Sequence, residues 1–97
     1  MKIFAVIRTR GAAWQAGLPL EQQSGWDRHA GFMDSLVEDG FVLLGGPLEG
    51  TADVLLIVRA NDPGEIVRRL APDPWTTNGL LKTKQIDPWT VRLGTPP

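Results

Sequence analysis

The chain contains a single histidine, and its place in the sequence makes it the first candidate for chemistry. In the segment 26–37, apolar side chains recur at helical spacing, and His29 falls among them rather than among the charged residues. The spacing predicts a helix that turns the histidine ring toward the interior. A buried imidazole needs partners for its nitrogens and can act as a general acid or base. A core histidine bonded to a backbone carbonyl fits the pattern equally well.

An acid–base histidine needs a carboxylate to orient it, and none stands three or four residues from His29. The partner must therefore come from another segment. Asp73 is our first candidate, because Pro72 and Pro74 stiffen the backbone on both sides of it. Taken alone, an aspartate here fits a turn or a cap better than a catalytic acid. The weaker candidates are the other acids near turns, namely Asp87, Asp53 and Glu49.

Several other residues could line a substrate pocket near the histidine. Arg8 ends the first apolar run and could bind a substrate carboxylate, with a solvated side chain as the alternative. Gly46 and Pro47 follow another apolar run, where a ligand could approach the backbone, although a strand-ending turn is the simpler interpretation. Aromatic side chains could form the apolar walls or belong only to the core: Trp14, Trp26, Phe32 and Trp75.

Composition excludes several other kinds of site. The 97 residues include no cysteine and one histidine, which leaves too few ligands for a metal and no thiol chemistry. The net charge of −1, without a basic block, argues against nucleic acid or an anionic membrane as a partner. No serine-nucleophile motif and no flavin or nicotinamide fingerprint occurs, so we expect no cofactor. Without a long apolar run or a signal peptide, we expect one cytoplasmic domain over 1–97.

Apolar runs rich in β-branched and aromatic residues predict the strands that carry these candidates. Such runs occupy 3–7, 41–44 and 54–58. A mixed run over about 80–91 contains Pro88 and therefore predicts an edge or bent strand. The second and third strands should be antiparallel, because the short connection between them cannot cross over the sheet.

Capping residues predict two helices between these strands. The first helix should begin after Ser24 as its N-cap and end at Gly40. The second should begin at Asp62, with a proline in its first turn. The segment 9–23 lacks periodicity and predicts a long loop around Trp14. The second helix should bury one face, made of Ile66, Val67, Leu70 and Ala71.

The predicted order of elements is β-α-β-β-α-β, which is the ferredoxin-like arrangement of an α+β fold. This arrangement has an antiparallel sheet with both helices on one face. The first three strands are apolar on both faces, yet two helices can cover only one of them. We therefore expect a homodimer in which two sheets pack face to face.

The segments around the candidate residues resemble the YciI-like (YCII-related) family of small ferredoxin-like proteins. In that family, a polar residue and a histidine on the first helix precede a glycine, an apolar strand and Gly-Pro, matched here by Arg28-His29, Gly40 and 41–47. A second signature, Asp-Pro-aromatic followed by a glycine and a closing strand, is matched by 73–80. The segment 86–89 also resembles the end of the family pattern. The resemblance covers most of the chain.

The resemblance implies a dimeric α+β barrel whose site is centred on His29 and Asp73. Relatives with an assigned reaction move protons on small ring compounds without a cofactor. This favours an enzyme of the lyase or isomerase type, in which His29 transfers a proton of a small cyclic or aromatic compound and Asp73 orients the ring. Two alternatives stay open: a non-catalytic module for ligand binding or dimerisation, and a ligand-sensing domain beside a transcription regulator.

Overall fold

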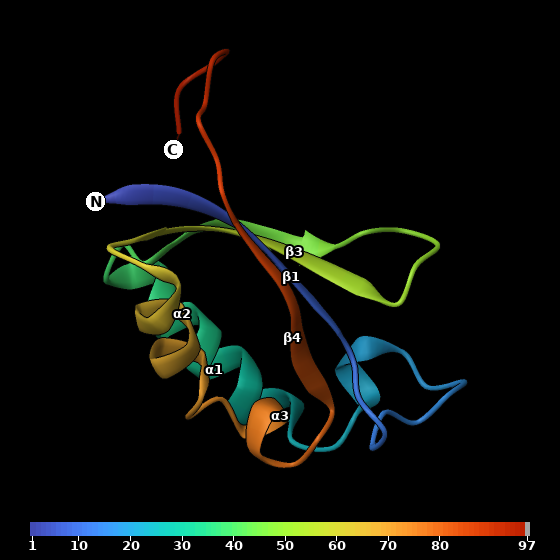
Figure 1. Cartoon of the computed structure of the whole chain (residues 1–97). Coiled ribbons are helices and arrows are strands. Elements are labelled where there is room, and N and C mark those ends of the chain that lie inside the picture. The colour runs from blue at the N-terminus through green and yellow to red at the C-terminus, as the bar shows by residue number, and fades with distance from the viewer. Residues whose placement is uncertain (97) are drawn as a thin grey trace.

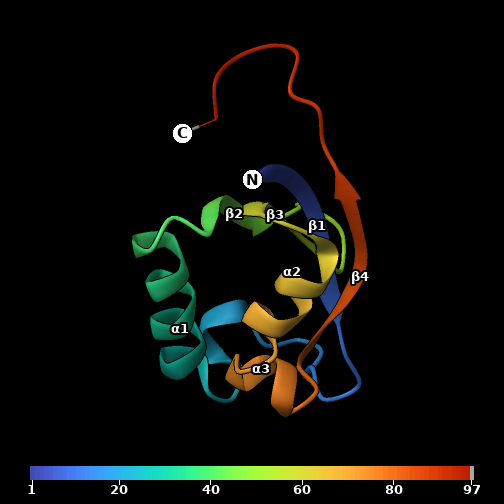
Figure 2. The same cartoon turned by 60° about the vertical axis from the view of Figure 1, so that its left-hand side comes forward.

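The fold is seen in a computed structural model that describes residues 1–96. Four strands form one antiparallel sheet in the order β2-β3-β1-β4. Figures 1 and 2 show α1 and α2 on the same side of this sheet. The elements along the chain are β1 (Lys2–Arg10), the 3-10 helix η1 (Leu20–Gln22), α1 (Trp26–Glu38), β2 (Val42–Pro47), β3 (Asp53–Ala60), α2 (Pro63–Leu70), α3 (Pro74–Thr77) and β4 (Leu81–Pro88). The order and topology confirm the predicted ferredoxin-like α+β fold.

The face of the sheet toward the helices carries the core. Alternation along β1 turns Phe4, Val6 and Arg8 to this face, where all three are buried. A second, smaller cluster forms around Trp75 where α3, the start of β4 and the 11–25 loop meet. The main cluster consists of Phe4, Val6, Leu36, Phe41, Val42, Leu56, Val58, Ala60, Ile66 and Leu70.

The strands differ from the sequence prediction at their ends. β1 continues to Arg10, so the loop predicted over 9–23 begins later. β2 continues through Gly45, Gly46 and Pro47, which the sequence had suggested as a turn. An edge strand tolerates a proline, and at Gly45 an added Cβ would lie 2.5 Å from a side-chain carbon of Leu56. β4 is an edge strand as predicted but ends at Pro88, before the predicted end near residue 91, and only the Trp89 N–H donates further, to the Ile3 carbonyl at 2.8 Å, among the described residues.

The start of α1 was predicted wrongly. Gly25, rather than Ser24, is the N-cap residue, and no side chain caps this end of the helix. Gly25 adopts a φ of 77°, a left-handed conformation that glycine reaches without strain. At the other end the chain turns at Gly40, also left-handed at a φ of 84°, as predicted for a residue just past a helix.

α2 begins as predicted but buries a narrower face. The Asp62 carboxylate accepts a hydrogen bond from the Glu65 backbone N–H at 2.8 Å, which is the expected N-cap. Ile66 and Leu70, four residues apart, face the core. Val67 is 56% exposed and Ala71 is exposed as well, because a helix this short turns only one row of side chains to the sheet. The following turn-like residues form the short helix α3, which was not predicted.

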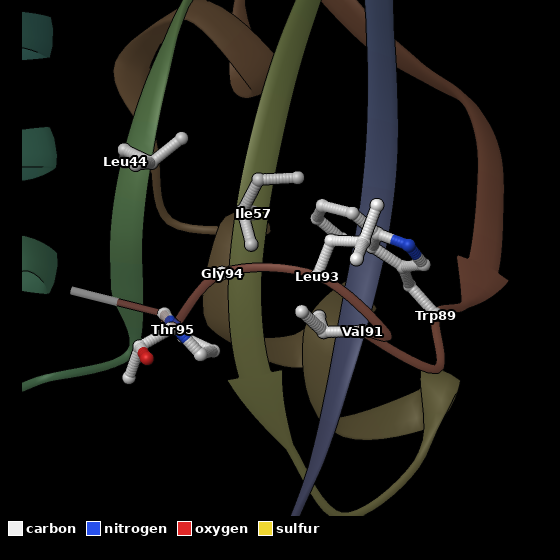
Figure 3. A pocket seen from close by; sticks show the side chains of 8 residues that line it. Leu44, Ile57, Trp89, Val91, Leu93, Gly94 and Thr95 are labelled. Atoms are coloured by element: carbon white, nitrogen blue, oxygen red, sulfur yellow. The ribbon is translucent and has the colours of Figure 1, made fainter.

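The face of the sheet away from the helices is partly covered by the chain itself. Figure 3 shows the segment 89–96 crossing this outer face near Leu44 and Ile57. Between segment and sheet lies a small apolar pocket of about 200 Å³. Among residues 1–96, no helix is long and apolar enough to cross a membrane.

Candidate active site

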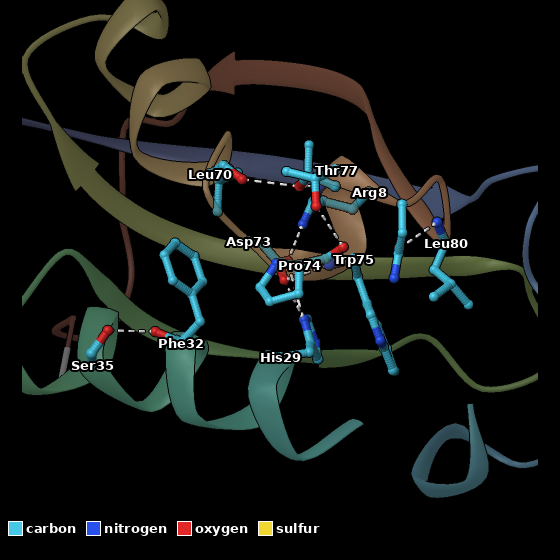
Figure 4. A network of polar contacts seen from close by, with 12 residues as sticks. Arg8, His29, Phe32, Ser35, Leu70, Asp73, Pro74, Trp75, Thr77 and Leu80 are labelled. Carbon is cyan, nitrogen blue, oxygen red and sulfur yellow. Dashed lines mark hydrogen bonds and ion pairs between the residues drawn. The ribbon is translucent and has the colours of Figure 1, made fainter. Parts of the chain in front are cut away.

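The structure brings His29 and Asp73 into direct contact (Figure 4). His29 lies in the first turns of α1, and Asp73 stands between the end of α2 and the start of α3. The His29 Nδ1 atom lies 2.8 Å from Asp73 Oδ1 and 3.0 Å from Oδ2. Because a carboxylate can only accept, the proton of the neutral ring is on Nδ1. His29 Nε2 is then the nitrogen that can exchange a proton with a ligand.

Asp73 also caps a helix, as the alternative interpretation of this residue predicted. Its side chain is the N-cap of α3 and accepts the Trp75 backbone N–H at 3.0 Å. The residue is 0% exposed, so its two oxygens depend wholly on protein donors. The capping bond and the His29 contact together fix the carboxylate in one orientation.

Arg8 supplies the opposite charge, and the solvated arginine considered from the sequence was wrong. The residue is only 1% exposed, and its Nη1 donates to Asp73 Oδ2 at 3.0 Å. Its Nη2 donates to Thr76 Oγ1 at 2.6 Å, and that hydroxyl donates to the Leu70 carbonyl at 2.9 Å. The Arg8 Nε atom is buried and has no partner among the described residues.

Trp75 holds the histidine ring from one side. The indole stacks on the His29 imidazole with centroids 3.9 Å apart and planes at 6°. The indole Nε1 donates to the Ser24 carbonyl at 2.7 Å, which ties the ring to the loop before α1. With Trp75 on one face and Asp73 at Nδ1, only the Nε2 edge and the opposite face of the imidazole remain for a ligand.

Burial and pairing act in opposite directions on the charges of this cluster. Burial by itself raises the pKa of Asp73, but the hydrogen bonds from His29 and the Trp75 backbone and the charge of Arg8 outweigh it and hold the pKa below its usual value. Burial lowers the pKa of Arg8, and the ion pair with Asp73 opposes that effect. A guanidinium keeps its proton under such conditions, so a buried +/− pair stands behind the histidine.

A cavity of about 310 Å³ opens beside the imidazole, between α1 and the sheet. Five of the residues proposed for the substrate pocket line it with His29: Arg8, Trp26, Gly46, Pro47 and Trp75. The other two do not. Phe32 packs against the main core cluster, and Trp14 lines an adjoining cavity, with its ring edge-on to Trp75 at 5.7 Å.

Comparison with known proteins extends this picture at the level of the fold. No family model and no curated protein matches the chain. Eight chains of solved structures do match. One is 5-chloro-2-hydroxyhydroquinone dehydrochlorinase from Burkholderia phenoliruptrix AC1100, in complex with 2,5-dihydroxybenzoquinone. The chain is similar to it in fold: the TM-score is 0.63 and the identity 21%, over 91% of this chain and 93% of that chain.

Sequence reasoning proposed Arg8 for the pocket but did not pair it with Asp73, and it missed Thr76. The inward direction of Arg8 could have been predicted, because it is in phase with Phe4 and Val6 on β1. No sequence pattern indicated the role of Thr76, because its contact with Arg8 depends on the short helix α3. In the part of the chain that the structure describes, no three metal-binding side chains of the His, Cys, Asp and Glu types lie together.

Proposed function

We propose that this protein is an acid–base enzyme of the lyase or isomerase type that works without a cofactor on a small cyclic or aromatic compound. The supporting observation is the His29–Asp73 contact at the wall of a cavity, with His29 Nε2 left for a ligand. This arrangement of a positioned imidazole and a buried orienting carboxylate suits general acid–base catalysis.

In this proposal, His29 Nε2 takes a proton from a carbon or oxygen of the bound ring. Asp73 keeps the ring in the tautomer with its proton on Nδ1 and stabilises the imidazolium that forms. Return of the proton at another ring position gives an isomerisation. Departure of an anionic leaving group as the ring electrons rearrange gives an elimination.

The size and walls of the cavity support a small ring as substrate. About 310 Å³ lies at the lower end of the range for small-molecule sites, which favours a compact ligand. Apolar side chains such as Leu20, Met33 and Leu56 make up most of the walls. The dehydrochlorinase of similar fold was solved with a ring compound bound, and the motifs around His29 and Asp73 resemble those of the YciI-like family.

The second candidate function is a non-catalytic module for ligand binding or dimerisation. One observation favours it: Asp73 caps α3 and pairs with Arg8, so the carboxylate stabilises the fold whether or not it takes part in a reaction. The two functions differ in whether bound ligands exchange protons with His29.

Proton exchange with solvent tests the proposed function directly. A panel of small ring compounds with an acidic C–H or O–H is incubated with the protein in D₂O, and NMR follows deuterium uptake and product formation. We expect turnover of at least one compound, and His29→Gln should lower kcat/KM by about 10²–10⁴-fold. Arg28→Gln, an exposed neighbour on α1, is the matched control and should keep full activity. Compounds that bind without exchange or turnover would establish the binding module instead.

We also propose a homodimer through the outer face of the sheet. That face carries apolar side chains in register on three strands, including Ile7, Leu55 and Leu44. The segment 89–96 lies on the same face, so a second copy would pack against this segment as well as against the sheet.

A further inference from the structure

Two opposite charges are buried directly behind the candidate base. The Arg8 and Asp73 side chains are both almost completely buried and lie 3.0 Å apart. The Arg8 guanidinium divides its bonds between Asp73 and Thr76 and leaves its Nε without a partner. An unpaired buried N–H is costly. Arg8 is therefore placed to pair with the Asp73 carboxylate, even though this position leaves one of its own N–H groups without a hydrogen bond.

Asp73 without Arg8 would act differently on His29. A buried carboxylate at 2.8 Å from Nδ1 favours the imidazolium, because the two then form an ion pair. A histidine held in that form cannot accept a proton from a substrate. With Arg8 in place, the carboxylate is already neutralised, and protonation of His29 leaves a net charge of +1 on the buried cluster.

The other charges near His29 do not replace this effect. On its own helix, Asp34 lines the same cavity, while Asp27 and Arg28 are exposed at the helix start. Glu21 on η1 is exposed too. The residues of β2, β3 and β4 that line the cavity within the described chain carry no ionisable group. Arg8 is thus the cation placed behind the His29–Asp73 pair.

We propose that Arg8 is a positioning residue that acts through Asp73 to keep His29 as the neutral imidazole, and so as a proton acceptor. The use of that neutral form rests on the proposed function. The protonation state itself can be measured without a substrate.

NMR titration of the only histidine in the folded protein tests this inference. In Arg8→Gln, the titration midpoint of His29 should move to higher pH by about one unit, because the carboxylate then acts on the imidazole alone. Arg8→Lys keeps the charge, so its midpoint should stay at the wild-type value within the error of the titration. Arg10→Gln, an exposed arginine two residues along β1, is the matched control. A midpoint that does not move in Arg8→Gln overturns the inference.

If Arg8→Gln does not fold, a milder variant can test the role of Arg8 instead. Thr76→Val removes the 2.6 Å bond to Arg8 Nη2 and keeps both buried charges. The loosened guanidinium should raise the midpoint by a few tenths of a unit, and no rise would overturn the inference.

The titration and the turnover assay can fail separately. A shifted midpoint without turnover of any compound supports the role of Arg8 and rejects the proposed enzyme. Turnover with an unmoved midpoint rejects the role of Arg8 alone. With a substrate at hand, the acid limb of the kcat/KM profile should move in Arg8→Gln by the same amount as the titration midpoint.

Discussion

Asp73 is the residue on which both the candidate site and the local fold depend. It accepts from His29, from Arg8 and from the Trp75 backbone while being 0% exposed. Asp73→Asn removes the charge that compensates Arg8 and leaves a buried guanidinium unpaired. We expect the free energy of unfolding to fall by about 3–5 kcal/mol, as measured by urea denaturation. Asp27→Asn, on the exposed side of α1, is the control and should change it by less than about 0.5 kcal/mol.

The same carboxylate makes stability depend on pH in a predictable direction. The pKa of Asp73 is held below its usual value in the folded protein, so folding favours the ionised form. Its contribution is complete above the unfolded value of about 3.9 and is lost as pH falls through the lower, folded value. The stability difference between wild type and Asp73→Asn should therefore shrink as the pH falls below about 4. A difference that stays constant into strong acid would contradict this assignment.

At the residue scale, the sequence predicted the pair and several residues of the pocket, but not the contacts that hold the pair in place. His29 and Asp73 could be paired because only one histidine exists and no acid stands beside it on the helix. The contact of Arg8 with Asp73 joins residues 65 positions apart, and no local pattern encodes such a contact. The stacking of Trp75 on His29 likewise depends on how α1 and α3 pack.

At the scale of elements, the two long helices begin in different ways. α2 has a side-chain cap in Asp62, whereas α1 follows a left-handed Gly25 and has none. Asp62→Ala should lower the free energy of unfolding by about 1 kcal/mol, because the Glu65 N–H loses its acceptor. Chemical denaturation measures the change.

Ser24→Ala provides the matched control for this substitution. Ser24 stands where a cap was expected, yet its side chain caps nothing, and only its backbone carbonyl is used, by Trp75. We expect a change of less than about 0.5 kcal/mol. An equal loss in both variants would show that the assignment of the caps is wrong.

Capping and periodicity predicted most elements, and the misses have physical reasons. Gly45, Gly46 and Pro47 are turn-forming residues by type, but pairing with β3 holds them in the strand. Ser24 satisfies the capping pattern, but Gly25 redirects the backbone before the helix starts. In the first segment, strand pairing overrides a local preference, and in the second a neighbouring glycine does.

At the scale of the whole molecule, the outer face of the sheet is where we propose that a second copy packs. The prediction that this face needs a cover came from β1, β2 and β3, whose sequences are apolar on both faces. The segment 89–96 supplies part of it, and no periodicity in that segment indicated this. Leu44 remains 50% exposed there and is a direct probe of the proposed dimer.

Sedimentation at several concentrations tests the dimer. We expect the wild type to sediment as a dimer, because Leu44 and the apolar residues beside it on this face would otherwise stay in contact with solvent. Leu44→Glu places a charge in this interface and should give a monomer. Val67→Glu, at a 56% exposed position on α2, should leave the dimer intact. A monomeric wild type would reject the proposal, whatever the variants do.

The site residues are far apart in the sequence, and this affects when the site can form during synthesis and folding. The contacts of the cluster join residues 44, 65 and 68 positions apart. During synthesis, no shorter chain that ends before Thr76 can hold the complete cluster. Helices form within their own segments, but this cluster waits until β1 has closed against the distant end of the chain. Any activity of the site is therefore a direct readout of completed folding.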